Sequence, residues 1–221
     1  MRVSARQDQS APVPGSLDAR VSGTCGTAVT STRGAPLSGP LDARLAVTPF
    51  SSVSDYLQVV DYFLGADEPS LQAMGVDPAK LPHRDAWLER LLPDLTRPDS
   101  LKQTFYLGWD YQGSRIGHCN LNPIRYGAEA HVHLHLWDPG ARRAGLGTEL
   151  LRLSIEIFFG RFALQRLYCE PYAHNAAPNR VLTKAGFRWL ERYRTTPGLI
   201  CFEQKVNRYV MERPVAGDFS P

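Results

Sequence analysis

The chain has 221 residues, of which 43% are hydrophobic and 21% are charged, and its formal net charge is +3 at pH 7. The length suits one domain with a substantial core plus a tail, and the composition is that of a soluble globular protein. The weak positive charge, with no block of basic residues interleaved with aromatic ones, argues against a nucleic-acid partner. No run of residues approaches the length of a membrane-spanning helix, and Met1–Asp8 lacks the apolar stretch of a secretory signal, so we expect no membrane association.

The four cysteines lie far apart and form no Cys-x-x-Cys pair, which argues against a zinc knuckle or a redox motif. Three of them, Cys119, Cys169 and Cys201, stand in apolar, strand-like contexts. Buried free thiols are typical of a reducing compartment, and we therefore expect a cytoplasmic protein.

The first part of the chain differs in composition from the rest. Ser, Gly, Pro, Ala and Thr dominate residues 1–44, and the first aromatic residue is Phe50. Such a segment cannot bury enough apolar surface to offset the entropy that is lost on ordering. We predict a disordered N-terminal tail over 1–44, one folded domain over 45–213 and a C-terminal tail over 214–221.

The predicted domain opens with short elements. A strand is predicted over 45–48, and a helix over 52–64, where apolar residues recur at helical spacing behind a serine cap. Residues 66–82 contain prolines and a glycine and are predicted to be irregular. A second helix is predicted over 83–92, with its apolar residues on one face.

The remainder of the domain combines strands and helices. A meander of strands comes first, followed by two helix–strand units and a closing strand. The predicted strands are 103–110, 115–122, 128–137, 166–170, 187–194 and 200–211, and the predicted helices are 147–160 and 176–185. Strands of mixed direction with helices on both faces predict an α/β protein built as a three-layer α/β/α sandwich.

A glycine motif stands between the strand 128–137 and the helix that follows it. The motif reads Arg142-x-x-Gly145-x-Gly147. Glycines at a strand-to-helix junction let the backbone approach a ligand closely, and the free amides at the helix start favour an anion. The motif therefore indicates a phosphate-bearing ligand, although a tight turn alone would explain two glycines equally well.

A second motif covers the next predicted helix. It starts at Asn175 and ends at Lys184-Ala185-Gly186-Phe187. The two motifs, in this order and behind a β-hairpin, resemble the GNAT superfamily of acetyl-CoA-dependent N-acetyltransferases over roughly 45–213. The resemblance implies a mixed central sheet whose middle strands splay apart, with acetyl-CoA bound in that gap as a co-substrate.

The resemblance also implies which residues contact acetyl-CoA. The pyrophosphate would lie on the amides and arginines of the first motif, the pantetheine arm along the edge of the preceding strand, and the second motif would contact the arm and the CoA tail. A plain helix N-cap is the alternative role for Asn175. The implied contact residues are Leu136, Trp137, Arg142, Arg143, Ala144, Gly145, Leu146, Gly147, Thr148, Asn175 and Asn179.

Histidines alternate along the strand before the first motif. Strand geometry puts His131, His133 and His135 on one face, together with Trp137, and the intervening valine and leucines on the core face. Histidine titrates near neutral pH and can act as a general base. The strand resembles that of the siderophore hydroxylysine acyltransferases within the superfamily, which implies His133 as the catalytic base and His135 as the second candidate. Hydrogen bonding across the sheet is the alternative role for these rings.

One position departs from the superfamily pattern. Many members carry a tyrosine four residues before the glycine that ends the second helix, where it protonates the leaving thiolate, and here that position holds Leu182. Either another group or water supplies the proton, or the enzyme relies mainly on positioning its substrates.

Two other functions fit parts of the sequence. His-x-His on a strand is also a metal-ligand spacing, with His118 or His174 as outer partners, but no clear carboxylate or cysteine set accompanies it, and we expect no metal. The second alternative is a GNAT-like module that binds acyl-CoA without transferring the acyl group, and the missing tyrosine slightly favours it.

The acceptor stays open between a small-molecule amine and a protein N-terminus. An aminoglycoside or a hydroxylysine-type siderophore precursor would represent the first class. The segments 66–82 and 195–198 are expected to flank the acceptor pocket, because loops of this kind vary most with substrate. The resemblance also allows a homodimer formed through the terminal strands.

Overall fold

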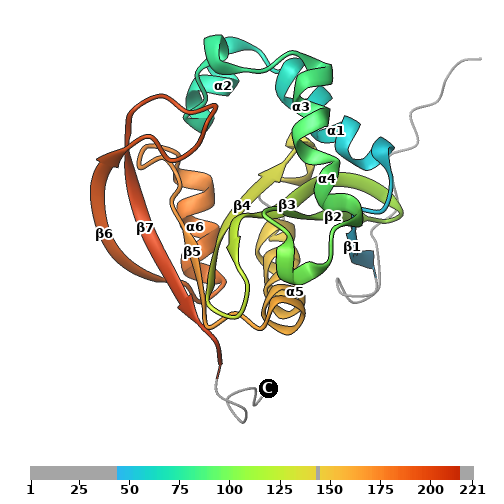
Figure 1. The fold of residues 1–221 in the computed structure, drawn as a ribbon. Coiled ribbons are helices and arrows are strands. Elements are labelled where there is room, and N and C mark those ends of the chain that lie inside the picture. The colour runs from blue at the N-terminus through green and yellow to red at the C-terminus, as the bar shows by residue number, and fades with distance from the viewer. Residues whose placement is uncertain (1–43, 143–144, 215–221) are drawn as a thin grey trace, which may run out of the picture. The chain divides into compact units, whose positions relative to one another are not determined.

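The computed structural model describes residues 44–142 and 145–214 (Figure 1). The N-terminal tail predicted over 1–44 lies outside the described residues except for Arg44, and so does the C-terminal tail after Pro214. The described residues form one mixed sheet with helices packed on both of its faces, which confirms the predicted fold class.

The sheet has seven strands in the order β1-β2-β3-β4-β5-β7-β6. β4 and β5 are parallel, and the other neighbouring strands are antiparallel. The strands are β1 Leu45–Pro49, β2 Phe105–Tyr111, β3 Ser114–Arg125, β4 Glu129–Leu136, β5 Arg166–Cys169, β6 Arg188–Thr195 and β7 Gln204–Glu212. The last strand is predicted to begin at residue 200, which is wrong, because β7 begins at Gln204 and Cys201 forms only an isolated bridge with Val76.

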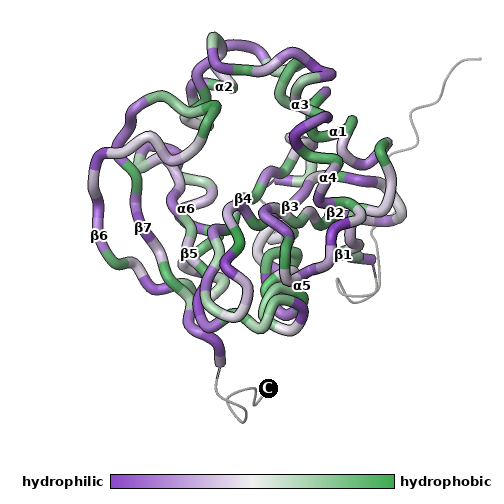
Figure 2. Tube along the Cα trace, viewed as in Figure 1, coloured by the Kyte–Doolittle hydropathy of each residue, from purple (hydrophilic) through white to green (hydrophobic). Residues whose placement is uncertain are grey.

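Helices α5 (Leu146–Phe162) and α6 (Ala176–Lys184) cover one face of the sheet. α5 is long and largely hydrophobic, as its colouring in Figure 2 shows. Burial of each large apolar side chain contributes about 1.5–3 kcal/mol. The fully buried side chains of α5 that pack in one core with strands β2–β5 are Leu150, Leu151, Phe158 and Phe162.

Helices α1 (Val53–Leu64) and α3 (Arg84–Leu91) pack against the opposite face, and the short α4 (Pro93–Thr96) follows α3. Ser52 caps α1, because its hydroxyl accepts from the Asp55 amide while the Asp55 carboxylate accepts from the Ser52 amide. The rings that join α1 to β2 have centroids 5.2–5.5 Å apart and belong to Phe50, Tyr56 and Tyr106.

The segment 66–82 was predicted to be irregular, which is wrong. It contains helix α2 (Glu68–Met74) and a 3-10 helix (Pro78–Lys80). The Asp67 side chain caps α2 at its start, and Gly75 ends it with φ at 83°. Pro69 and Pro78 stand in the first turns of the two helices, where the missing amide would have no partner in any case.

The α2 segment contacts the connection between β6 and β7, which lies far away in the sequence (Figure 1). The amide of Asp77 donates to the carbonyl of Ile200 at 2.8 Å. The side-chain amide of Gln204 donates to the carbonyl of Gly75 at 2.9 Å. These bonds tie the helical segment that follows α1 to the end of the sheet formed by β6 and β7.

The sheet splits between β4 and β5. Their ladder holds the pairs Glu129↔Arg166, Ala130↔Leu167 and His131↔Tyr168. β4 then continues to Leu136 while it stays paired with β3 on its other side. Within the described residues, the β4 edge from Val132 to Leu136 therefore faces the split without a strand partner, as the predicted splay requires.

Candidate active site

The three histidines of β4 lie on the face that carries α1, as their alternation predicted. Val132, between two of them, is 1% exposed and belongs to the core on the α5 face. Leu134 and Leu136 are half-buried against that same core. Each histidine of the row meets different neighbours, so the three rings differ in chemistry.

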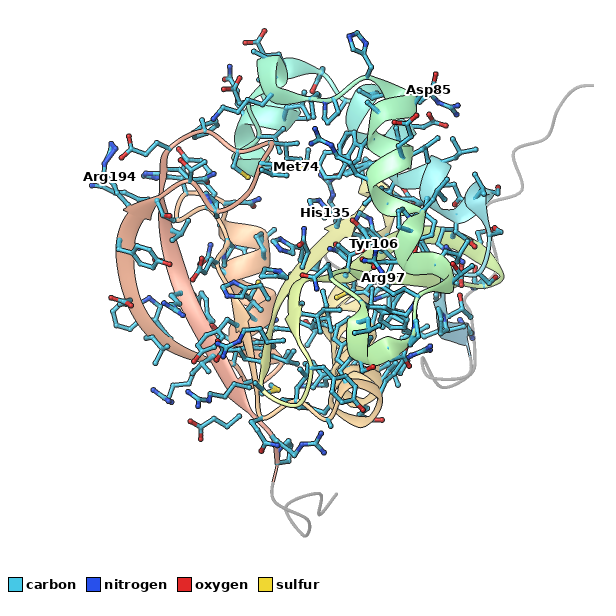
Figure 3. All side chains as sticks on the ribbon, viewed as in Figure 1. Met74, Asp85, Arg97, Tyr106, His135 and Arg194 are labelled. Carbon is cyan, nitrogen blue, oxygen red and sulfur yellow. The ribbon has the colours of Figure 1, made fainter. Side chains whose placement is uncertain are left out.

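His135 is packed among aromatic rings. It stacks on His118 with centroids 4.9 Å apart and planes at 12°, and it meets Phe63 of α1 edge-on at 5.0 Å. Figure 3 shows His135 extending from β4 toward the side chains of the helices on this face. Burial lowers the pKa of His135 to about 3. A ring with such a pKa holds a proton weakly, which makes His135 the poorer of the two candidate bases.

Trp137 completes an aromatic cluster with Tyr62, Phe63, His118 and His135. Its indole Nε1 donates a hydrogen bond of 2.9 Å to Nδ1 of His118, and its ring stacks on Tyr62 with centroids 5.8 Å apart. Trp137 is predicted to contact acetyl-CoA, and its ring lies on the α1 face within this aromatic cluster.

His133 is held by the backbone of β3. Its Nε2 lies 2.8 Å from the carbonyl oxygen of Asn122. The register of β3 with β4 shifts between Leu121 and Ile124. At this bulge the Asn122 carbonyl is not used in the β3–β4 ladder and is available to the His133 ring. A carbonyl only accepts hydrogen bonds, so the proton of the neutral ring is assigned to Nε2 and the lone pair to Nδ1. Nδ1 is therefore the atom that can act as a base.

The surroundings of His133 keep its ring neutral at neutral pH. Burial lowers the pKa of His133, and the hydrogen bond to the Asn122 carbonyl raises it. The neutral form is the one that a general base requires.

His131 lies where the split begins, and it leads to a group of residues that the sequence motifs did not include. Its ring centroid is 5.6 Å from that of Tyr168 on β5. Glu170 follows β5 and lies on the same face as Tyr168, because Arg208 contacts both the Glu170 carboxylate and the Tyr168 ring. Glu170 accepts a hydrogen bond of 2.7 Å from the hydroxyl of Tyr193, and Arg208 pairs with it at 3.3 Å. The position of Glu170 could have been inferred from the β5 pattern, but its partners on β6 and β7 could not.

The glycine loop ends at the start of α5. Gly145 adopts φ of 81°, a left-handed conformation that favours glycine. Apart from its chain neighbours, no described atom lies within 4 Å of the position that a Cβ would take, so the backbone here is open to a ligand. Leu146 and Thr148 are 2% and 7% exposed and anchor the first turn of the helix. A Cβ on Gly147 would lie 3.8 Å from Val181 of α6.

Arg142 links the loop to the free edge of β4. Its guanidinium donates to the carbonyl of Leu136 at 3.4 Å. The amides at the start of α5, the positive end of its dipole and this arginine together suit a pyrophosphate. Arg143 and Ala144, which are also predicted to contact acetyl-CoA, lie outside the described residues.

Asn175 and Asn179 have different surroundings at the start of α6. Asn175 stands at the N-cap position of α6, but its side chain makes no capping hydrogen bond. The structure therefore does not support the alternative role of Asn175 as a plain helix N-cap. Asn179 donates through Nδ2 to the carbonyls of Asn175 and Tyr172 at 2.6 and 3.1 Å. Its Oδ1 accepts from the Asn207 amide at 2.6 Å and from the Tyr209 hydroxyl at 3.1 Å. Asn179 thus fastens α6 to β7, and a ligand contact through this side chain would replace one of these bonds.

Leu182 is fully buried in the core on the α5 face. The position at which many GNAT members carry a tyrosine is therefore a packed apolar position in this chain. α6 supplies no acid for a leaving thiolate from this position.

In residues 44–142 and 145–214, no group of three or more His, Cys, Asp or Glu side chains is arranged to hold a metal ion. Among the described residues, no helix is both long enough and apolar enough to cross a membrane.

Comparisons with known proteins identify the family. Residues 44–188 match the family model of the acetyltransferase (GNAT) domain, whereas curated protein sequences gave no match.

Among solved structures, the chain is similar to RimL, a ribosomal L7/L12 alpha-N-protein acetyltransferase, in complex with coenzyme A. The TM-score is 0.61 and the identity 16%, and the match covers 78% of this chain and 96% of that chain. It is also similar to the microcin C7 self-immunity acetyltransferase MccE in complex with acetyl-CoA and AMP, with a TM-score of 0.60, 13% identity, and 76% and 92% covered. The aminoglycoside acetyltransferase AAC(6')-Ib in complex with coenzyme A and kanamycin gives a TM-score of 0.56, 18% identity, and 76% and 95% covered. The chain therefore belongs to the GNAT acetyltransferase family, which uses acetyl-CoA as its acyl donor.

Proposed function

We propose that the protein transfers the acetyl group of acetyl-CoA directly to a primary amine or hydroxylamine, with His133 as the general base. The observation that supports this most is the 2.8 Å contact between His133 Nε2 and the Asn122 carbonyl, because it leaves Nδ1 as the basic nitrogen on the face beside the split. His135 is the second candidate, with the weaker basicity that its packing causes.

In the proposed reaction, His133 Nδ1 accepts a proton from the acceptor amine. The amine nitrogen forms a bond to the acetyl carbonyl carbon, and the carbon–sulfur bond breaks. The imidazolium, directly or through water, returns the proton to the thiolate, because Leu182 cannot supply one. The products are the acetylated amine and free CoA thiol, and His133 is neutral again.

The described residues fit an acyl-CoA in two places. The amides that follow Gly145 suit the pyrophosphate, and the free β4 edge up to Leu136 suits the amides of the pantetheine arm, in the manner of an added strand. We keep the contact set predicted from the sequence and assign Asn179 a role through its hold on α6.

The acceptor is proposed to be either a protein N-terminus or a small-molecule amine. RimL is described as an acetyltransferase of ribosomal L7/L12, and AAC(6')-Ib was solved with kanamycin. These two similarities support both acceptor classes, and a transfer assay with both kinds of amine distinguishes them.

The test is a transfer assay with acetyl-CoA and a panel of amines that includes N-terminal peptides, aminoglycosides and N6-hydroxylysine. Release of free thiol and the mass of the acetylated product are measured together. Product that depends on one amine supports the proposal and names its acceptor class. Absence of saturable acetyl-CoA binding in isothermal titration would overturn it.

A second candidate function is a module that binds acetyl-CoA without transferring its acetyl group. The buried Leu182, at the place of the usual acid, favours it. Saturable binding of acetyl-CoA at one site per chain, with no product from the whole amine panel, is the result expected of such a module.

A further inference from the structure

Glu170 faces the proposed base across the split in the sheet. β4 and β5 run parallel, and His131 is paired with Tyr168 at the last rung of their ladder. Side chains two residues further along a strand return to the same face. His133 on β4 and Glu170 after β5 therefore flank the split from its two sides, on the face that carries α1.

The Glu170 carboxylate is fixed by two neighbouring strands. The Tyr193 hydroxyl donates to Oε1 at 2.7 Å, and Nε of Arg208 lies 3.3 Å from the same oxygen. The Glu170 side chain is 11% exposed. The Arg208 guanidinium is itself held, since its Cζ lies 4.6 Å from the centre of the Tyr168 ring. Both contacts use Oε1, so the carboxylate has a defined orientation.

We propose that Glu170 is a positioning residue for His133, whose carboxylate stabilises the imidazolium that forms when His133 accepts the proton of the acceptor amine. This inference rests on the proposed function, in which His133 is the base. The stabilisation of the imidazolium is electrostatic. A fixed carboxylate near a developing positive charge in a partly buried site lowers the free energy of the protonated His133 ring.

The groups around His133 explain why Glu170 has this role. Burial lowers the pKa of both His133 and His131, and the charge of Glu170 partly offsets this by raising both. In the described residues, Glu170 is the carboxylate that acts on His133 through charge. The titratable side chains that act on His133 or respond to it are His131, His135, His118 and Glu170. Tyr168 contacts His131, and Tyr193 and Arg208 contact Glu170.

The test compares Glu170→Gln with the unchanged protein. Glutamine keeps an oxygen that can accept from Tyr193, so this variant removes the charge and leaves the local hydrogen bond in place. The titration of the His133 ring is followed by NMR, with His133→Ala to assign its signal. The pH dependence of kcat/KM is measured with the amine identified in the panel. Glu129→Gln serves as the matched control, because Glu129 begins β4 and is paired with Arg125.

We expect Glu170→Gln to lower the pKa of His133, to move the acidic limb of the kcat/KM profile to lower pH and to reduce kcat by about threefold to tenfold. Binding of acetyl-CoA should not change, and Glu129→Gln should match the unchanged protein. An unaltered His133 titration in Glu170→Gln overturns the role of Glu170 while the proposed function stands. If no amine is acetylated, the proposed function fails, and the NMR titration still decides whether Glu170 acts on His133.

Discussion

Nε1 of Trp137 donates a hydrogen bond of 2.9 Å to Nδ1 of His118, and this bond fixes the tautomer of a histidine that is 1% exposed. The proton of His118 must then be on Nε2. His118 stacks on His135, so the same bond also helps to orient the His135 ring. His135 is the next histidine along β4 after His133, the proposed base.

Replacing Trp137 by phenylalanine tests this bond. The variant keeps an aromatic ring against Tyr62 but leaves the buried Nδ1 of His118 without its donor, so we expect a loss of about 1–3 kcal/mol in the free energy of unfolding. Urea denaturation measures the loss. Trp189→Phe is the matched control, because Trp189 is 53% exposed, and an equal loss in both variants would contradict the argument.

The stability of the fold should fall as the pH is lowered, because the aromatic cluster requires neutral histidines. Burial holds the pKa of His118 well below its ordinary value and lowers that of His135 to about 3. In the unfolded chain both rings titrate near 6.5, so the unfolded state binds more protons below that pH. Their contribution to stability is therefore fully present above about pH 6.5 and is lost progressively as the pH falls toward about 3.

His135→Phe should flatten that dependence, because phenylalanine keeps the stack on His118 and carries no titratable group. The free energy of unfolding from urea titrations at several pH values between 7 and 4 gives the slope. His83→Ala, at the exposed start of α3, should leave the slope unchanged. If the free energy of unfolding depended on pH equally in His135→Phe and the unchanged protein, the neutral His135 ring would not be the cause of the stability loss at low pH.

Replacing Gly145 by valine should abolish acetyl-CoA binding while the fold persists. The variant forces a β-branched residue into φ of 81° and adds atoms where the backbone is open to a ligand. Gly127→Val is the matched control, with φ of 75° and equally open space at the β3–β4 turn. Both should lose about 1–3 kcal/mol of stability, and isothermal titration should show lost binding only in Gly145→Val.

The two asparagines of α6 should separate binding from stability. Asn179→Ala removes the oxygen that accepts a hydrogen bond from the buried Asn207 side chain. We expect a loss of about 1–3 kcal/mol in the free energy of unfolding. Asn175→Ala removes no capping bond, so stability should change by less than about 0.5 kcal/mol while acetyl-CoA binds more weakly. A large stability loss in Asn175→Ala would assign it a structural role instead.

The sequence was most informative where the signal is local. The alternation of His133 with its apolar neighbours predicted which face each side chain of β4 takes, and Gly145 marked the start of α5. The sequence does not predict α2, because proline is rare inside helices, whereas Pro69 stands in the first turn of α2 and Pro78 in that of the 3-10 helix.

The contacts that distinguish the three histidines could not be predicted in the same way. His135 meets Phe63 from α1, and His133 meets a β3 carbonyl that is released by a bulge. Glu170 meets partners from β6 and β7. Each of these contacts joins elements far apart in the chain, and no short-range spacing encodes them.

The most direct test of the central claim is the kcat of His133→Ala with acetyl-CoA and the best amine of the panel. If His133 is the general base, kcat should fall by about 10²–10⁴-fold while the affinity for acetyl-CoA stays the same, and His83→Ala should keep full activity. A His133→Ala variant with the kcat of the unchanged protein would contradict the account and would leave the chemistry to another group on this face.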